Sequence, residues 1–318
     1  MNCHCCSGNC RKSGSYHNRN RIVQRYACDR CGKSFSESQP LDGLRIEHSK
    51  VVQIVKLLCE GMGIRATARL TDCHRDTVLA VLETTGRKCA ALLDARVRYL
   101  KAENVQTDEI HSFAGCKQVR TVKSDIERGE FFTFLSVDRD SKLIINWKTD
   151  KRNYETTEDF LRDLKSRMMG RFQLTTDAFK GYCRKTEGGV EEVFGNSIDY
   201  ATETKMYGYE QIAPFRFVPR VKFIKRKARI GNPDMRMATT CHCERTNLSV
   251  RQFTRRFARS TLGYSKTVTN LRHAVALFVA HFNYCRVHSA HKQTPAQAAM
   301  LTKDAWTVER LLEECAKY

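Results

Sequence analysis

The sequence predicts a multidomain α/β protein, and three observations support this class. Residues 1–35 are rich in cysteine, residues 49–95 carry apolar side chains at helical spacing, and from residue 100 to 290 short β-type runs alternate with amphipathic helical segments. The last pattern is that of a sheet with helices packed on it. The polar residues 36–48 contain proline and glycine, as expected for a linker, and residues 291–318 are expected to form a C-terminal helical tail.

The composition favours a polyanionic partner. The 318-residue chain has 55 Lys and Arg against 35 Asp and Glu, a formal net charge of +20, which favours nucleic acid over the alternative of a solvated basic surface. No run of about 18 apolar residues exists to cross a bilayer, and no secretory signal is visible. We therefore expect an intracellular protein without membrane attachment, whose fifteen cysteines are thiols or metal ligands instead of disulfides.

Two cysteine pairs predict a zinc site in residues 1–35. This segment is poor in aliphatic residues and cannot build a core large enough to fold alone. Cys3-x-x-Cys6 and Cys28-x-x-Cys31 supply two thiolate pairs, each short enough to hold one tetrahedral Zn²⁺ from a tight turn. The alternative is a set of reduced structural cysteines with chance spacing. Three further residues crowd the first pair and leave its membership open: His4, Cys5 and Cys10.

The residues from 49 to 95 predict a helix-turn-helix. Apolar spacing indicates three short helices, with a three-residue turn at 71–73 before the last one. The third helix, from His74 through Glu83, would enter the major groove of DNA by its N-terminal residues. The alternative is an ordinary helical hairpin. The expected DNA contacts are that N-terminus and two phosphate-binding residues beyond it: Arg75, Asp76, Thr77, Arg87 and Lys88.

Three acids on separate elements are candidates for metal-dependent catalysis. Asp108 lies in the first predicted strand, 104–115, Asp177 ends the strand 172–177, and Glu244 begins a long helical region. Three converging carboxylates can hold two divalent cations, which share a phosphodiester and stabilise its attacking and leaving oxygens. Each acid alone has a simpler explanation: a strand-end cap, a helix N-cap or an ion-pair partner.

The other acids of this region are assigned to a turn. Strands are predicted at 130–138 and 142–149, so that Asp138 and Asp140 lie in the hairpin turn and outside the site. Helices are expected at two further places, residues 154–169 and residues 178–185.

Four motifs resemble those of a known family. QTDEIHSF around Asp108, TTDAFKGY around Asp177 and the Glu-Arg-x-Asn-Leu-x-x-Arg string at Glu244 resemble the acidic motifs of the insertion-sequence-one family of bacterial transposases. HFNYCRVHSAHKQTPAQAA, residues 281–299, is similar to the family's C-terminal motif. The resemblance covers nearly the whole chain, including the cysteine segment and the helix-turn-helix.

This chain departs from the family pattern at three places. Its zinc segment lacks the usual Cys-Pro pair, and its recognition helix begins at His74 where a serine cap is more usual. Cys241, His242 and Cys243 precede the glutamate. Alternating ligands one residue apart diverge on a helix, so a second zinc site is not expected there.

The resemblance implies a DNA transposase with an RNase H-like catalytic fold. Its Asp-Asp-Glu triad, at Asp108, Asp177 and Glu244, would hold Mg²⁺ or Mn²⁺. The implied activity is binding of the terminal inverted repeats of an insertion sequence, phosphodiester cleavage, and strand transfer into target DNA. The implied partners are double-stranded DNA, as element ends and as target, and further copies of the chain on paired ends. The implied location is the bacterial cytoplasm, at the nucleoid.

Basic residues near the third acid are expected to contact DNA. The family's basic residue seven positions beyond the glutamate is Arg251 here, and Arg255 and Arg256 extend the basic surface. Residues 216–234 are expected to line a DNA path, the alternative being a solvated strand and loop.

Two other functions stay open from the sequence. A DNA-binding regulator or an inactive transposase relic would need the cysteines and the recognition helix but not the acids. A metal-dependent nuclease would use the acids without strand transfer.

Overall fold

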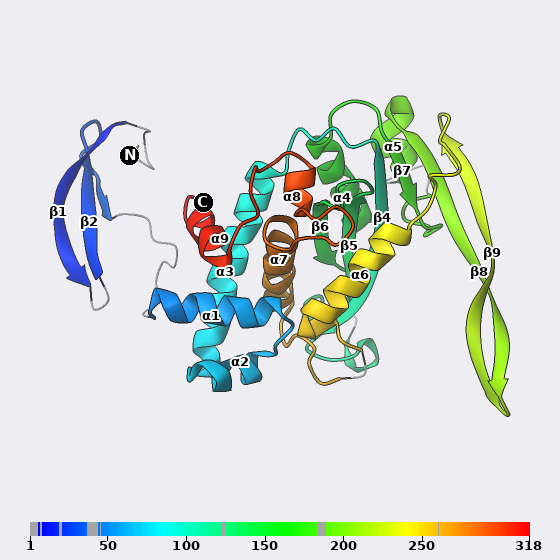
Figure 1. The fold of residues 1–318 in the computed structure, drawn as a ribbon, viewed down its shortest axis with the longest axis horizontal. Coiled ribbons are helices and arrows are strands. Elements are labelled where there is room, and N and C mark those ends of the chain that lie inside the picture. The colour runs from blue at the N-terminus through cyan, green and yellow to red at the C-terminus, as the bar shows by residue number, and fades with distance from the viewer. Residues whose placement is uncertain are drawn as a thin grey trace.

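The computed structural model describes residues 6, 8–18, 21–36, 44, 46–122, 125–183, 189–259 and 261–318. Within these residues the fold is mixed α/β, with a three-stranded sheet near the N-terminus, a helical layer and a six-stranded sheet (Figure 1). The strands are β1 Cys10–Asn18, β2 Arg21–Cys28, β3 Ser34–Ser36, β4 Asn104–Ala114, β5 Gly129–Asp138, β6 Ile144–Asp150, β7 Gln173–Thr176, β8 Asp199–Ala213 and β9 Arg216–Ile230. The α-helices are α1 His48–Cys59, α2 Ile64–Thr71, α3 Arg75–Arg96, α4 Tyr154–Arg167, α5 Val190–Phe194, α6 Cys241–Phe253, α7 Val268–Tyr284, α8 Pro295–Ala298 and α9 Val308–Cys315.

The larger sheet has the order β6-β5-β4-β7-β8-β9. Strand β4 pairs antiparallel with β5 and parallel with β7, and β7 pairs parallel with β8. The side chains of Val105, Ile110 and Leu135 are fully buried, because α6 packs on β4 and β5 while α4 and α7 pack on β6. The predicted turn between β5 and β6 is confirmed, and the carboxylate of Asp138 accepts a hydrogen bond from the Ser141 backbone N–H at 3.0 Å.

The helix-turn-helix candidate packs on the rest of the molecule through α3. This helix continues to Arg96 instead of ending near Glu83, and its second half packs against α7 (Figure 1). The two helices meet at Gly86, where an added Cβ would lie 2.6 Å from the backbone oxygen of His273. Lys88, which the sequence predicts to contact phosphate, lies in this second part of α3 and is only 3% exposed.

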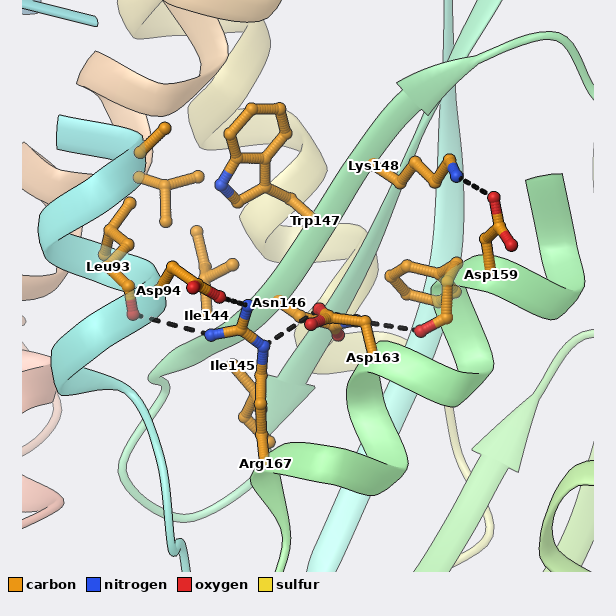
Figure 2. Close-up of a pocket in the computed structure, with 13 residues that line it drawn as sticks. Leu93, Asp94, Ile144, Ile145, Asn146, Trp147, Lys148, Asp159, Asp163 and Arg167 are labelled. Atoms are coloured by element: carbon orange, nitrogen blue, oxygen red, sulfur yellow. Dashed lines mark hydrogen bonds and ion pairs between the residues drawn. The ribbon is translucent and has the colours of Figure 1, made fainter. Parts of the chain in front are cut away.

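An ion-pair network ties α3 to α4 (Figure 2). The guanidinium of Arg167 at the end of α4 donates to Asp163 and to Asp94 of α3, both at 2.8 Å. It also donates to the backbone oxygens of Leu93 and Val97, at 3.4 and 3.1 Å. Arg167 is only 8% exposed, so its charge is compensated by partners and not by water.

Replacing Arg167 with alanine should destabilise the protein by roughly 2–4 kcal/mol. The change leaves two carbonyl oxygens and a half-buried carboxylate without their charged donor. Urea unfolding measures the effect. The matched change Arg162→Ala removes an exposed arginine of the same helix, which forms an ion pair with Glu158. This change should cost less than about 1 kcal/mol. Equal losses in the two variants would contradict the structural role of the network.

Two further findings concern local structure. Residues 178–183 contain no helix, with a turn at 180–182, so the expected helix at 178–185 is wrong over its described part. Asp177 accepts from the backbone N–H of Phe179 at 2.9 Å, and this side-chain turn competes with helix formation. No helix among the described residues is long and apolar enough to cross a membrane.

Candidate active site

Two of the predicted acids meet because β4 and β7 run parallel. Thr107 of β4 and Thr176 of β7 are the last residues that these two strands pair. Asp108 and Asp177 come next on the two strands and therefore lie side by side. Glu244 lies in the first turn of α6, which packs on β4. All three acids line one cleft with a volume of about 760 Å³.

The acidic group at this cleft contains a residue that the sequence does not predict. Asp108, Glu109 and Asp177 each offer a carboxylate oxygen within 4.8 Å of the others. This group can hold a metal ion, since hard divalent cations prefer carboxylate ligands. Glu109 also accepts a hydrogen bond from Arg152 at 3.0 Å. Its only signal in the sequence is its position beside Asp108, and strand alternation would direct it to the opposite face.

Glu244 stands apart from this group of three acids. Its carboxylate accepts a hydrogen bond from Thr240 at 2.9 Å and is ion-paired with Lys205. One turn further along α6, the amide of Asn247 donates to Asp108 at 2.9 Å. The side chain of Asn247 therefore connects α6 to the acidic group, while the carboxylate of Glu244 faces a lysine.

Two side chains of the sheet hold the N-terminus of α6 against the cleft. The side-chain oxygen of Gln106 on β4 accepts from the backbone N–H groups of His242 and Cys243, at 2.9 and 3.2 Å. Glu203 on β8, only 3% exposed, accepts from the backbone N–H of Thr240 at 3.2 Å. The first N–H groups of a helix have no partner inside it, so these contacts fix the position of the turn that carries Glu244.

Burial changes the acid–base properties of the cleft. Desolvation raises the pKa of Asp108 to about 6, and the nearby charges of Asp177 and Glu244 act in the same direction. Burial and the charge of Asp177 raise the pKa of Glu109 to about 7, and burial also raises the pKa of Asp177. These carboxylates are crowded and poorly solvated, and a bound cation relieves both conditions.

Replacing Asp108 with asparagine should stabilise the metal-free protein at alkaline pH. The folded carboxyl titrates near 6 and the unfolded one near 3.8. The wild type therefore loses stability as the pH rises through this window, because its unfolded state releases the proton first. The difference in unfolding free energy should grow to roughly 1–2 kcal/mol above the window. Urea unfolding from about pH 4.5 to 8 without divalent ions measures it; a difference that shrinks with pH would contradict the pKa assignment.

The arginines beyond Glu244 occupy different environments. Arg251 lines the cleft, and burial, followed by the charge of Arg259, lowers its pKa. Arg255 is exposed. Burial lowers the pKa of Arg256 to about 10, and its guanidinium donates to Ser265 at 3.4 Å. Arg256 is therefore partly buried, and its contact with DNA stays a prediction.

Three of the predicted zinc ligands form a group. The Sγ atoms of Cys6, Cys28 and Cys31 lie within 4.8 Å of one another, and Gly8 packs against two of them, since a Cβ there would be 3.3–3.4 Å from the sulfurs of Cys28 and Cys6. A hydrogen bond from the Cys31 backbone lowers the pKa of Cys28 to about 6, which favours the thiolate that binds metals. Cys3, with His4 and Cys5, lies outside the described residues.

The α3 residues that the sequence predicts to contact DNA have different exposures. Arg75 and Asp76 are exposed and Thr77 is partly buried, and Arg87 is exposed further along α3. His74 caps the helix, accepting from the backbone N–H of Asp76 at 3.4 Å.

The cysteines of α6 are separated from each other. Cys243 is fully buried and donates to the backbone oxygen of Leu135 at 3.6 Å, whereas Cys241 is exposed. Between them, His242 lies 3.2 Å from the amino group of Lys142. Within the described part of the chain, none of these three residues belongs to a group that could hold a metal ion.

Comparison with known proteins gives a distant likeness. No protein-family model matches this chain, and no curated protein matches it. Among solved structures, the chain is similar to the cryo-EM structure of a piggyBac transposase synaptic complex with hairpin DNA, with 9% sequence identity and a TM-score of 0.40. The similarity covers 85% of this chain and 70% of that chain.

Proposed function

We propose that this protein is a DNA transposase that cleaves phosphodiester bonds and joins the released ends to target DNA. The observation that carries the proposal is the meeting of Asp108, Asp177 and Glu244 at one cleft, from β4, β7 and α6. The sheet supports it as well: in the run β6-β5-β4-β7-β8, only β5 is antiparallel to the other strands. That arrangement is the one expected of an RNase H-like domain.

The donor set of the cleft fits Mg²⁺ or Mn²⁺. Asp108 and Asp177 contribute hard oxygen ligands from adjacent strands, and Glu244 supplies a third carboxylate once it releases Lys205. A pair of divalent cations bound there would supply a nucleophilic hydroxide or activated 3′-hydroxyl and neutralise charge on the scissile phosphate. The resemblance to the insertion-sequence-one family assigns Glu244 to this role, and Glu109 is the alternative third ligand.

The side chains around the acids suit a nucleic-acid backbone. Arg251, Lys180 and Lys205 line the same cleft and can contact phosphate oxygens on either side of the scissile bond. Gln106 and Glu203 keep the first turn of α6 in place, so that the third carboxylate is held on a rigid element. We assign Arg251 and Arg255 to DNA binding from α6 and the turn that follows it.

The N-terminal modules complete the proposal. Zn²⁺ fits the group of Cys6, Cys28 and Cys31, since three thiolates and one further ligand form the usual structural site; Cys3 is the proposed fourth ligand. The first residues of α3, with Arg87, are proposed to bind the element's terminal repeat through its major groove and phosphates. Self-association on paired ends and a place at the bacterial nucleoid belong to the same proposal.

A cleavage and joining assay tests this function. The full chain is incubated with Mg²⁺, a target plasmid and DNA that carries the sequence flanking the gene, where inverted repeats are expected. The proposal requires cleaved ends and joined products that depend on the divalent ion. Cleavage without joining would replace it with a nuclease, and binding without either reaction would replace it with a non-catalytic DNA-binding protein.

A further inference from the structure

Strands β8 and β9 form a long ribbon that projects from the edge of the six-stranded sheet (Figure 1). Only Asp199–Thr202 of β8 pair with β7, whereas the two strands pair with each other as far as Ala213 and Arg216. The ribbon carries large apolar side chains that are exposed to solvent. An edge of this kind is costly for a soluble protein unless a partner covers it.

The register of the ribbon separates its two faces. Side chains alternate along β8, so Tyr207, Tyr209 and Gln211 share one face. Phe217 of β9 lies opposite Gln211 and therefore belongs to the same face. Their exposed fractions are 62%, 78% and 57%. We call these three rings the aromatic face. Val221 and Pro219 lie opposite the two tyrosines on the same face.

The aromatic face is continuous with the acidic cleft. Lys205, two residues before Tyr207 on the same face, is ion-paired with Glu244. Tyr207 itself lines the cleft together with Asp108 and Asp177. If a DNA strand binds with its scissile phosphate next to Asp108 and Asp177, the neighbouring nucleotides of that strand would lie beside the aromatic face.

The opposite face of the ribbon carries positive charge. Arg220 lies opposite Gly208 there and is ion-paired with Glu210 of the same face. The side chain of Lys222 passes over Gly208, because it would overlap a Cβ placed on that glycine. Lys225 lies opposite Thr204 on that face. Lys222 and Lys225 make the ribbon attractive to a polyanion through their charge, while the rings on the other face offer flat apolar surfaces for bases.

We propose that the aromatic face binds unpaired bases of a DNA strand next to the cleavage site. This inference rests on the proposed function for the identity of the strand. Unpaired bases fit better than a closed duplex because they offer ring faces for stacking, whereas a duplex hides these faces inside its base stack. Binding should be tolerant of sequence, because every base offers a ring face for stacking.

Binding of a fluorescein-labelled oligothymidine by the full chain tests the proposal, in the Asp177→Asn background without divalent ions. Phe217→Leu and Tyr209→Leu should each weaken binding by at least about fivefold, because leucine keeps apolar surface but cannot stack on a base. Tyr209→Phe should retain affinity. Phe223→Leu is the matched control, since Phe223 has 58% exposure and lies opposite Met206 on the other face. A blunt duplex of the same length should be bound equally by all of these variants.

Three results would overturn the proposal: unchanged oligothymidine binding in both leucine variants, equal losses in Phe217→Leu and Phe223→Leu, or a change of sedimentation behaviour without a change in DNA affinity. The last result would assign the aromatic face to a second copy of the chain. The binding measurement needs no catalysis, so it separates the two proposals. Ring-dependent binding by a wild type that does not cleave DNA would remove the transposase function alone, and ring-independent binding by a chain that cleaves and joins would remove this inference alone.

Discussion

Replacing Asp177 with asparagine should reduce DNA cleavage and joining by a factor on the order of 10³ or more. The substitution keeps the size of the side chain but removes a charged ligand from the group formed with Asp108 and Glu109. A carboxamide binds a divalent cation more weakly than a carboxylate does. Cleavage rates under single-turnover conditions, with Mg²⁺ in excess, measure the effect. DNA binding should remain within about threefold of wild type, since the change removes one negative charge and leaves the arginines and lysines of the cleft in place.

The matched control is Asp140→Asn. Asp140 is an exposed acid in the turn between β5 and β6, where it pairs with Arg139 at 3.3 Å. Its substitution should leave both cleavage and joining at wild-type rates. Cleavage that survives Asp177→Asn, or an equal loss in both variants, would remove Asp177 from the reaction.

Replacing Cys28 with serine should release one equivalent of zinc and unfold the N-terminal sheet. Cys28 ends β2 and lies within reach of the sulfurs of Cys6 and Cys31. The rest of the three-stranded sheet offers little core, with Val23 and Cys28 as its buried apolar residues among those that the structure describes. Binding of a structural zinc ion contributes roughly 10 kcal/mol or more to folding in such small modules. Elemental analysis and proteolysis of β1–β3 measure the two effects.

Cys241→Ser is the control for zinc content. This exposed cysteine of α6 belongs to none of the metal-binding groups within the described residues, so its substitution should leave one zinc ion per chain. Zinc that is retained after Cys28→Ser, or a folded and protease-resistant N-terminal sheet that never contained metal, would contradict the assignment.

The predictable parts of the site are those that depend on local order along the chain. Asp177 follows a short apolar run, and a strand that is buried on both faces places its C-terminal acid at the edge of a sheet. Asp108 differs, because it lies within β4, between the buried residues Val105 and Ile110, and strand alternation predicts only the face that it occupies. The pairing of β4 with β7, which brings these two acids together, cannot be predicted from any local sequence pattern.

The missed parts depend on tertiary packing. The apolar pattern of α3 does not reveal where the helix ends. Lys88 lies in its second half, which packs on other helices, and is buried instead of exposed. The strand β8 was not expected, because its outer half is exposed on both faces and has no alternation of apolar and polar residues. Glu109 is not among the acids predicted from the sequence, and strand alternation directs it away from the face of Asp108, yet it joins the group at the cleft.

Titration of Mn²⁺ into the zinc-loaded protein, followed by electron paramagnetic resonance, tests the central claim most directly. If Asp108, Asp177 and Glu244 form the divalent cation site, the wild type should bind Mn²⁺, and Asp177→Asn and Glu244→Gln should each weaken that binding by at least about tenfold. Asp140→Asn should leave it unchanged. Mn²⁺ binding that is the same in the wild type and in both cleft variants would contradict the account.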